Sequence, residues 1–457
     1  MKNWKFELLL LLRSRPATGA LVVLALLSAL SVWNGMRAMA AQRIALERIA
    51  AVHAADLADR TARQPADGDA GLTAYYTPHL TFDPAPPLAF AAIGQRDVQP
   101  YALQVRALGL QAQLYESEAI NPELAAPGRF DFAFVLVYLA PLFIIALMHD
   151  LVSGEREAGR LRLLSSLPGK PGALWRRRVL LRLLLVAAAL LLPLLAGALL
   201  SSAAPGETAL MAGAALLYVA FWCGAAAWGA AVARNAAAGA ALLLAAFVLL
   251  ALVLPTGVNA ALERAVPVAQ GAELALAQRQ AVHTAWDKPR EETMQRFFRT
   301  HPEWENTAPL PEGFHWKWYY AMHQAGDDMV AGQAALYRGA LWSREQWARN
   351  AGLLLAGVNV QVLLHRLAGT DLQARMAYLD RVAAYHERVR RQFYPYVFGE
   401  RPFGPADFAR LPVFAPAPGS GLPPATLVCA LALLAGAALL LGLRSTARVT
   451  MGPDPMG

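Results

Sequence analysis

Six apolar segments, each close to the length of a membrane crossing, set the strongest limit on how this chain can fold. A bilayer core of about 30 Å takes roughly 20 mostly apolar residues in helical form. The segments are Ala17–Met36, Phe132–Met148, Val179–Ser201, Ala209–Val232, Ala236–Leu254 and Ala425–Leu443. With 56% hydrophobic and 16% charged residues, the chain is too apolar for an ordinary soluble protein and too polar to be all membrane. We therefore expect an all-α polytopic membrane protein with six transmembrane helices and separate wet regions.

Basic residues orient these segments, because Lys and Arg near the ends of short loops mark the cytoplasmic side. Three cytoplasmic parts are predicted on this basis: residues 149–178, the connection at Arg234, and the tail 444–457. The loop 202–208 carries Glu207 and no base, which places it outside. With this alternation both termini are cytoplasmic.

Two long polar regions, 37–131 and 255–424, are then extracytoplasmic insertions, and both are expected to be mostly helical. Helices are expected at 40–64, 259–285 with a break at Pro267, 290–300, 317–342, 347–367 and 371–394. The two cysteines, Cys223 and Cys429, lie in apolar runs, so no disulfide can hold these regions. We expect the two insertions to pack together around one core.

Two segments admit a second interpretation. Residues 1–16, with Lys and Arg before an apolar run, are expected to form a cytoplasmic interfacial elbow helix leading into the first span, but they also imitate the start of a cleavable signal peptide. Residues 351–364 are apolar enough to suggest a seventh span. They are short for a crossing and contain Asn359 and Gln361, so a buried helix of the outer domain or one on the outer leaflet is the preferred interpretation.

A charged segment between the second and third spans, Ser153–Pro168, carries the main functional signal. Its acids, glycine and ordered leucines resemble the coupling segment of ABC-2-type ABC transporter permeases, which docks onto a separate ATP-hydrolysing subunit. The resemblance implies an ATPase-coupling role for Glu155, Arg156, Glu157, Gly159, Leu161 and Leu164. Two departures affect partner specificity: Arg160 stands where Thr is common, and Gly154 precedes the acids. A solvated helix whose bases bind anionic lipid is the alternative.

Further motifs extend this resemblance to a bacterial subgroup of these permeases that carries large extracytoplasmic insertions. They are Gly94–Asp97, Asn121–Glu123, Gly128–Val135, Tyr138–Leu142, Ala368–Asp371, Tyr385–His386 and Phe393–Pro395. The resemblance implies a multi-pass protein of the bacterial inner (cytoplasmic) membrane, surrounded by membrane lipids. It also implies an ABC ATP-binding subunit as partner and a second permease subunit, either in a homodimer or as a similar paralogue. ATP and Mg are expected on the partner ATPase, with no cofactor and no metal bound by this chain.

The sequence gives little support for nucleotide binding, hydrolysis, nucleic-acid binding or metal binding by this chain. The run from Gly154 to Arg160 lacks the Lys-Ser/Thr pair of a phosphate loop, and no hydrolase or zinc-protease motif occurs. The net charge of +8 is clustered beside apolar runs and forms no single stripe, so we expect no nucleic-acid partner. A weaker candidate for a metal or aromatic-ligand site combines His315, His323, Asp327 and Asp328 with Trp316, Trp318, Tyr319 and Tyr320. A packed amphipathic helix is the simpler interpretation of that group.

The sequence therefore predicts the permease subunit of an ABC exporter, without enzymatic activity of its own. One alternative is a mechanotransmitting subunit, which uses ATP hydrolysis inside to act on a periplasmic partner without moving a solute. Another is a membrane-anchored sensor or binding protein. The transported substrate cannot be identified from these residues.

Overall fold

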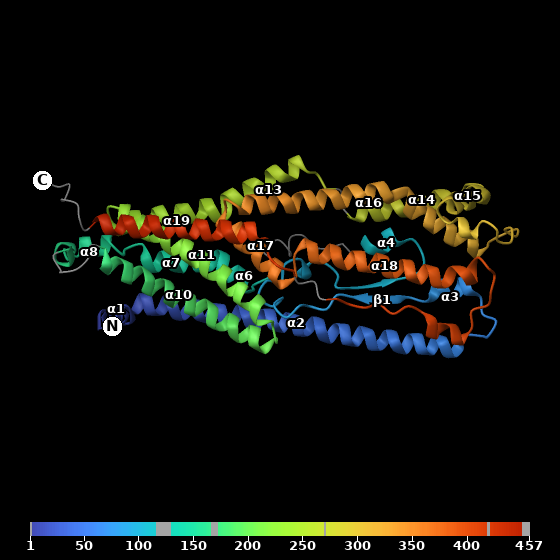
Figure 1. The fold of residues 1–457 in the computed structure, drawn as a ribbon, viewed down its shortest axis with the longest axis horizontal. Helices are drawn as coiled ribbons and strands as arrows, with labels where there is room; N and C mark the ends of the chain where they lie inside the picture. Colours follow the sequence, from blue (N-terminus) through green and yellow to red (C-terminus); the bar gives the residue numbers. More distant parts are fainter. Residues whose placement is uncertain (1, 116–128, 166–171, 269–270, 418–420, 450–457) are drawn as a thin grey trace.

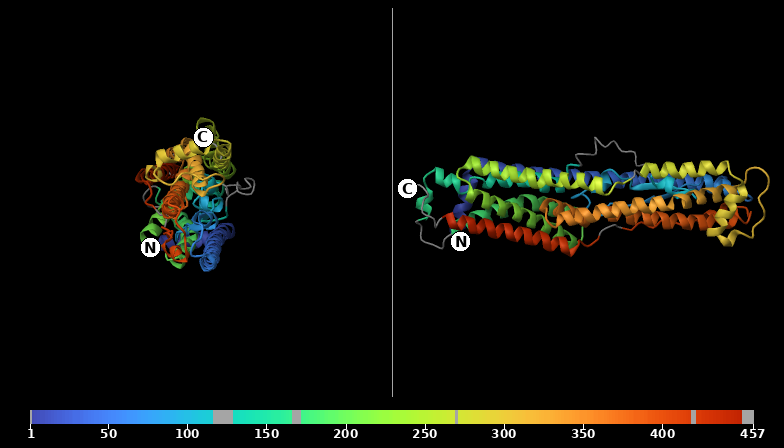
Figure 2. Two further views of the ribbon diagram at one scale, coloured as in Figure 1. Left: turned by 90° about the vertical axis from the view of Figure 1, so that its right-hand side faces the viewer. Right: turned by 90° about the horizontal axis from the view of Figure 1, so that it is seen from above.

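The computed structural model describes residues 2–115, 129–165, 172–268, 271–417 and 421–449. The molecule is an elongated rod with both termini at one end (Figure 1). The view from above in Figure 2 shows the same long outline. The motif at Asn121–Glu123, residue 128 and the last part of the charged segment, 166–168, lie outside the described residues.

Among the described residues, six helices are long and apolar enough to cross a membrane, and each overlaps one of the six predicted segments. The first is α2, Arg15–Arg63, preceded by the short α1, Lys2–Arg13. The others are α6 (Phe132–Phe134) with η2 (Val135–Leu139), α7 (Ala140–Met148) and α8 (Ser153–Glu157); α10 (Ala173–Leu200); α11 (Pro205–Val232); α12 (Ala236–Phe247) with η3 (Val248–Val253) and α13 (Leu254–Ala265); and α19 (Ala425–Val449). We call their packed parts the span bundle.

Asparagine and aspartate side chains cap the start of two of these helices. The Asn235 side chain accepts a hydrogen bond from the Ala238 backbone nitrogen and caps α12. Asp131 caps α6 in the same way through the Phe134 nitrogen. Such caps satisfy backbone donors that a helix start leaves without partners. They explain why these helices begin at the boundaries between polar and apolar sequence.

The rest of the chain forms a second body at the end away from the termini, which we call the distal unit. Its elements are α3 (Ala70–Tyr76), β1 (His79–Phe82), η1 (Gly94–Asp97), β2 (Ala102–Val105), α4 (Leu110–Tyr115), α14 (Gly271–Trp286), α15 (Arg290–Thr300), η4 (Pro302–Trp304), α16 (Trp316–Gly352), α18 (Leu372–Val397) and η5 (Pro405–Arg410). The outward half of α2 lies beside them (Figure 1).

One hydrophobic core of the distal unit draws on both predicted polar regions. Leu103 and Val105 come from the first region, and Phe297 and Val389 come from the second. The expected shared core is therefore confirmed as a structural fact. The short antiparallel pairing of β1 with β2 was not predicted, because strands of four residues leave almost no periodic signal.

Two helix boundaries in the second polar region can be compared with prediction. The break near Pro267 is confirmed, since α13 ends at Ala265 and α14 begins at Gly271. The predicted break between 342 and 347 is wrong, because α16 runs without interruption to Gly352. Ser343–Gln346 contains no Gly or Pro, so nothing there opposes a continuous helix.

The apolar segment 351–364 contributes most of a short helix, α17, Ala356–Ala368, which is not among the six membrane-length helices. Its buried residues Val360, Leu363 and Leu364 belong to the core of the span bundle. The Asn359 side chain donates hydrogen bonds to the carbonyls of Gly352 and Leu427, at 2.8 and 3.0 Å. A helix that follows the distal α16 is thus packed among the spans.

Candidate functional site

The charged segment folds as two short helices, α8 and α9 (Leu161–Ser165), joined by a turn at Gly159. Gly159 has φ +68°, a left-handed conformation that glycine adopts without steric cost. The Arg160 nitrogen donates to the Glu155 carbonyl at 2.9 Å and closes this turn. The segment is placed at the same end of the rod as the two termini (Figure 1).

Glu155 joins this segment to the neighbouring helices through ion pairs. One carboxylate oxygen accepts from Arg178 of α10 at 2.8 Å, and the other accepts from Arg160 at 2.6 Å. Arg178 also binds Glu7 of α1 at 3.0 Å. The side chains of Glu155 and Arg178 are only 13% and 8% exposed, so neither charge is presented freely to solvent. Removing one partner would leave a largely buried charge uncompensated, which is costly.

Arg156 and Glu157 fix the same segment to the start of α12. The Arg156 guanidinium donates to the carbonyls of Ala233 and Arg234 at 3.0 and 3.1 Å. The Glu157 carboxylate accepts from the Ala236 backbone nitrogen at 2.8 Å. A carboxylate at a helix start interacts favourably with the unpaired N–H groups and the helix dipole. The predicted coupling acids therefore hold the segment on the spans.

The leucines of the segment face different ways. Leu161 packs against the core of the span bundle, and Leu164 is half-buried. Leu163, which was not among the predicted coupling residues, is 67% exposed. The docking role of Leu161 and Leu164 stays a prediction. Among the three leucines of α9, Leu163 has the most solvent-exposed side chain.

Two partners in this network, Arg178 and Glu7, were missed by sequence reasoning. Arg178 was read only as one of three consecutive arginines before the third span. Glu7 is the only acidic residue before Glu47, in a stretch whose other charges are basic. A lone acid in a basic, apolar segment is a usable signal for an internal ion pair, because nothing else in that segment would favour it.

A second group of contacts ties the distal unit to the span bundle. Residues Leu88, Phe90, Ala91 and Ala92 precede η1 and belong to the bundle core, as α17 does. The Thr370 hydroxyl, just after α17, donates to the Ala92 carbonyl at 2.7 Å. The Gln95 nitrogen donates back to the Thr370 carbonyl at 3.1 Å. We call α17 with residues 88–92 the junction.

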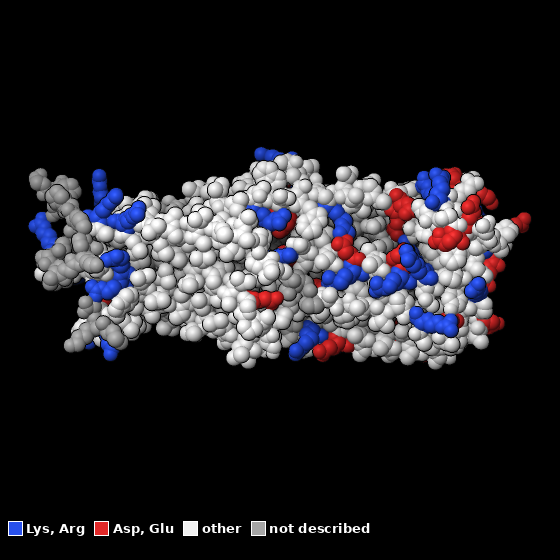
Figure 3. All heavy atoms as spheres, viewed as in Figure 1, with Lys and Arg blue, Asp and Glu red and all other residues white. Residues whose placement is uncertain are grey.

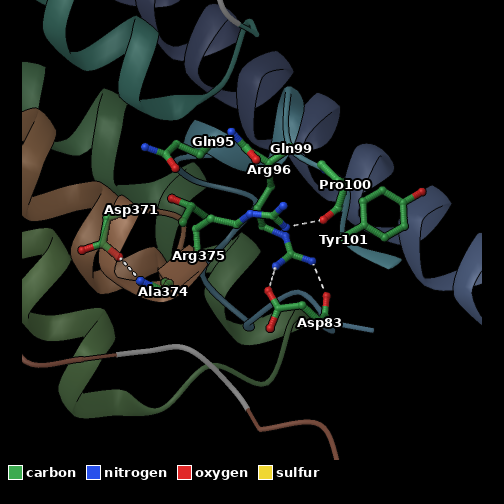
Figure 4. A pocket seen from close by; sticks show the side chains of 11 residues that line it. Asp83, Gln95, Arg96, Gln99, Pro100, Tyr101, Asp371, Ala374 and Arg375 are labelled. Carbon is green, nitrogen blue, oxygen red and sulfur yellow. Dashed lines mark hydrogen bonds and ion pairs between the residues drawn. The ribbon is translucent and has the colours of Figure 1, made fainter. Parts of the chain in front are cut away.

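Charged side chains line a small cavity next to Gly369 and Thr370, just after α17 (Figure 4). The Arg96 guanidinium donates to the side chain and the carbonyl of Asp83, both at 2.6 Å, and Arg381 of α18 reaches the same carboxylate at 3.0 Å. Arg375 donates to the Pro100 carbonyl at 2.5 Å. The cavity between them is about 20 Å³, enough for a water molecule or two and too small for a solute. These hydrogen bonds and ion pairs therefore connect α18 to the segment from Asp83 to Pro100 and stabilise the packing beside the junction.

Two of the predicted metal or ligand residues of α16, Asp327 and His323, bind backbone groups at the start of α4. Asp327 accepts from the nitrogens of Leu110 and Gln111 at the start of α4, and from Arg390 of α18 at 2.9 Å. His323 accepts from the Gly109 nitrogen at 3.3 Å, and burial lowers its pKa to about 4. Within the described ranges, no group of three or more His, Cys, Asp or Glu is placed to hold a metal ion. The cluster holds α4 between α16 and α18.

Comparison with known proteins gives one match. The profile of a family described as a domain of unknown function, DUF3526, matches residues 272–417. This stretch runs from α14 to the segment after η5 and includes α17, while most of the spans and the α8–α9 segment lie outside it. No curated protein and no solved structure matches the chain.

Proposed function

We propose that this chain is the membrane permease subunit of an ABC exporter in a bacterial inner membrane. A separate ABC ATP-binding subunit would bind ATP and Mg and dock on the α8–α9 segment. A second permease subunit, identical or similar, would complete the membrane part. The observation that carries the proposal is the attachment of one charged segment to α10 and to the start of α12 through Glu155, Arg156 and Glu157. Arg178, the partner of Glu155, also binds Glu7 and so links the same network to α1.

The charge distribution supports this orientation. On the face drawn in Figure 3, Lys and Arg gather at the end that holds the termini, a broad zone without charged side chains follows, and both signs appear beyond it. A basic margin beside an apolar belt is typical of the cytoplasmic side of a membrane protein. The α8–α9 segment would then lie where an ATPase can reach it, and the distal unit would lie outside.

The contacts also supply a route for movement. Displacing α8 would pull on α10 through the pair of Glu155 with Arg178, and on α12 through Glu157. The spans contact the distal unit through α17, whose leucines pack in the bundle core. A transporter switches by rigid shifts of packed helices, and such shifts need contacts of this kind between the moving parts.

The continuous helix α2 favours the mechanotransmitter as a second candidate. Its 49 residues give a length of about 73 Å, so it extends from the span bundle along the distal unit. A single stiff helix of this length would carry a tilt in the spans directly to an external partner. A membrane-anchored sensor would share the distal unit but would need no ATPase at α8–α9.

The exposed Leu163 gives a direct test of ATPase docking. The chain is purified with the ATPase of the neighbouring reading frame, and association and ATP turnover are measured in lipid nanodiscs. Leu163→Glu should weaken association at least ten-fold, since it places a charge in an apolar contact. Val413→Glu is the matched control, because Val413 is 85% exposed and lies in the second polar region, and it should bind normally.

Two results would contradict the proposal. One is a wild-type chain that does not associate with the ATPase at all, which would leave the anchored sensor as the better account. The other is unchanged association and turnover in Leu163→Glu, which would exclude the α8–α9 segment as the docking surface. Transport of a candidate lipid-like solute by the loaded complex would separate export from mechanotransmission.

A further inference from the structure

One face of α16 carries large apolar side chains that the described chain leaves largely or partly exposed. Met329, Leu336, Trp347 and Leu354, the last just past the helix end, are 40%, 75%, 53% and 79% exposed. The spacings of seven and eleven residues place Met329, Leu336 and Trp347 on one side of a helix of 3.6 residues per turn, and Leu354 follows in the turn after the helix end. We call this line of residues the α16 stripe.

Small and uncharged residues fill the positions between these side chains. Gly332 and Gly339 lie on the stripe, and a Cβ added at either would meet no atom within 4 Å. Ser343 and Asn350 continue the same line. Glycines at a helix surface let a second helix approach closely. The stripe is therefore an uncharged seam with room for another backbone.

The charged residues of this part of α16 point elsewhere. Arg338 pairs with Asp380 of α18, and Arg344 donates to the Val266 carbonyl just after α13. Helical spacing also places Glu345 and Arg349 on the opposite side from Leu336. A run from Met329 to Leu354 thus exposes apolar surface without one charge among its stripe positions.

Lipid cannot cover the whole of this stripe. Its length is about 37 Å, and α16 runs along the long axis of the molecule, away from the spans (Figure 1). Leu354 lies close to α17, which is packed in the span bundle, but Leu336 lies about 27 Å further along the helix. Even with Leu354 at the membrane surface, Leu336 and Met329 would be in water. An exposed apolar line of this length in water indicates a protein contact.

We propose that the α16 stripe packs in parallel against the same stripe of a second copy of this chain. A two-fold axis along α16 brings each stripe residue close to its own counterpart, so a charge there would face a like charge. The lack of charge on the stripe fits this self-contact, whereas a different partner would allow complementary charges. The seven-residue spacing of Gly332 and Gly339 also matches a parallel helix pair.

The neighbouring α13 continues this contact towards the spans. α13 has no buried residue, and Gly257 on it has open space at its Cβ position. It follows η3, where Leu252 and Val253 are 43% and 53% exposed. The apolar surface therefore runs from a predicted span to the distal unit. The inference deepens the proposed function, because it names the surface through which two permease subunits meet.

Single cysteines test the geometry in native membranes. In a Cys223→Ala, Cys429→Ser background, Ser343→Cys places a thiol on the stripe, and Ala331→Cys places an exposed thiol on another side of α16. A disulfide needs Cβ atoms about 3.5–4.5 Å apart, which only a self-facing position provides. Mild oxidation should give at least ten-fold more covalent dimer with Ser343→Cys. Equal cross-linking at the two positions would overturn the proposal.

A second measurement removes dependence on the cysteine chemistry. Leu336→Arg should convert a dimeric chain in nanodiscs to a monomer, seen by light scattering, and this monomer should still unfold cooperatively on heating. Ala331→Arg should leave the dimer intact. A dimer that survives Leu336→Arg, or a wild-type chain that is monomeric, would overturn the inference. ATPase association is measured on the same samples, so loss of the dimer contact is distinguished from failure of the proposed function.

Discussion

In the span bundle, helices approach until their backbones touch, whereas in the distal unit they are kept apart by aromatic rings and buried ion pairs. A Cβ added at Gly224 of α11 would lie 2.4 Å from the Leu439 nitrogen of α19. In the distal unit, Phe297 of α15 stacks on Phe398, just after α18, with ring centres 4.8 Å apart. Arg390 and Asp327 form an ion pair with 5% and 11% of their side chains exposed.

The difference follows from the surroundings proposed for each body. Lipid tails are as apolar as leucine, so helices in a bilayer gain little by hiding apolar side chains and depend on close packing. In water, burying large aromatic side chains is the main source of stability. The junction combines the two bodies. Its helix α17 follows α16 of the distal unit in sequence, but its buried side chains belong to the core of the span bundle.

The largest expected effect comes from filling the closest helix contact. Gly224→Leu places a branched side chain against the α19 backbone, which cannot move aside as a side chain can. The free energy of unfolding should therefore fall by more than about 3 kcal/mol. We expect no folded monodisperse protein by fluorescence-detected size-exclusion chromatography. Gly213→Leu on the same helix is the control, because no atom lies within 4 Å of its Cβ position. Similar behaviour of the two variants would show that α11 and α19 do not pack as described.

A smaller loss is expected from breaking the ion pair in the distal unit. Arg390→Met leaves the Asp327 carboxylate buried without its cation, which should lower the free energy of unfolding by about 3–5 kcal/mol. Thermal unfolding followed by tryptophan fluorescence measures it. Arg391→Met is the control, because Arg391 is 78% exposed and pairs only with Glu387 at the surface. If the two neighbouring variants are equally stable, the pair is not a buried one.

The smallest of these effects is a pH dependence confined to the distal unit. His79 is 4% exposed against Tyr385 and Phe393, and burial lowers its pKa from 6.5 to about 4. Above pH 6.5 it is neutral in both the folded and unfolded states. Below that, the unfolded state takes up the proton first, so stability falls by about 1.4 kcal/mol per pH unit until about pH 4.

Replacing this imidazole by a ring that does not titrate should reduce the dependence. We expect His79→Phe to flatten the curve of unfolding free energy against pH between 6.5 and 4. His386 is also buried, with a pKa held well below its usual value, so part of the slope should remain. An unaltered slope in His79→Phe would contradict a buried neutral imidazole.

Parts of the fold could be predicted because they depend on local pattern alone. The membrane-length helices could be predicted from the length and apolar composition of their segments. The break near Pro267 could be predicted because proline has no backbone N–H to donate within a helix. The continuation of α16 through Ser343–Gln346 and the pairing of β1 with β2 could not be predicted. Both depend on neighbours distant in sequence, and short elements carry weak signals of their own.

In the candidate site, too, the sequence indicated some residues, and only the structure showed their partners. The types and spacing of Glu155, Arg156 and Glu157 marked the charged segment as unusual, but their partners come from other helices. Arg178 lies 23 residues from Glu155, and Ala236 lies 79 residues from Glu157. No local pattern specifies such pairs. The exposed Leu163 and the partly buried Leu161 could likewise be distinguished only from the packing of α9 against the bundle.

The sequence by itself determined which segments are apolar enough to form spans, where the bases gather and where most helices start and stop, because these follow from composition and local backbone chemistry. Only the tertiary structure decided that the two polar regions share one core, that α17 joins the spans, and that the described chain leaves the α16 stripe largely or partly exposed. Burial is a property of the whole packed chain, and the same leucine is core or surface according to what lies against it.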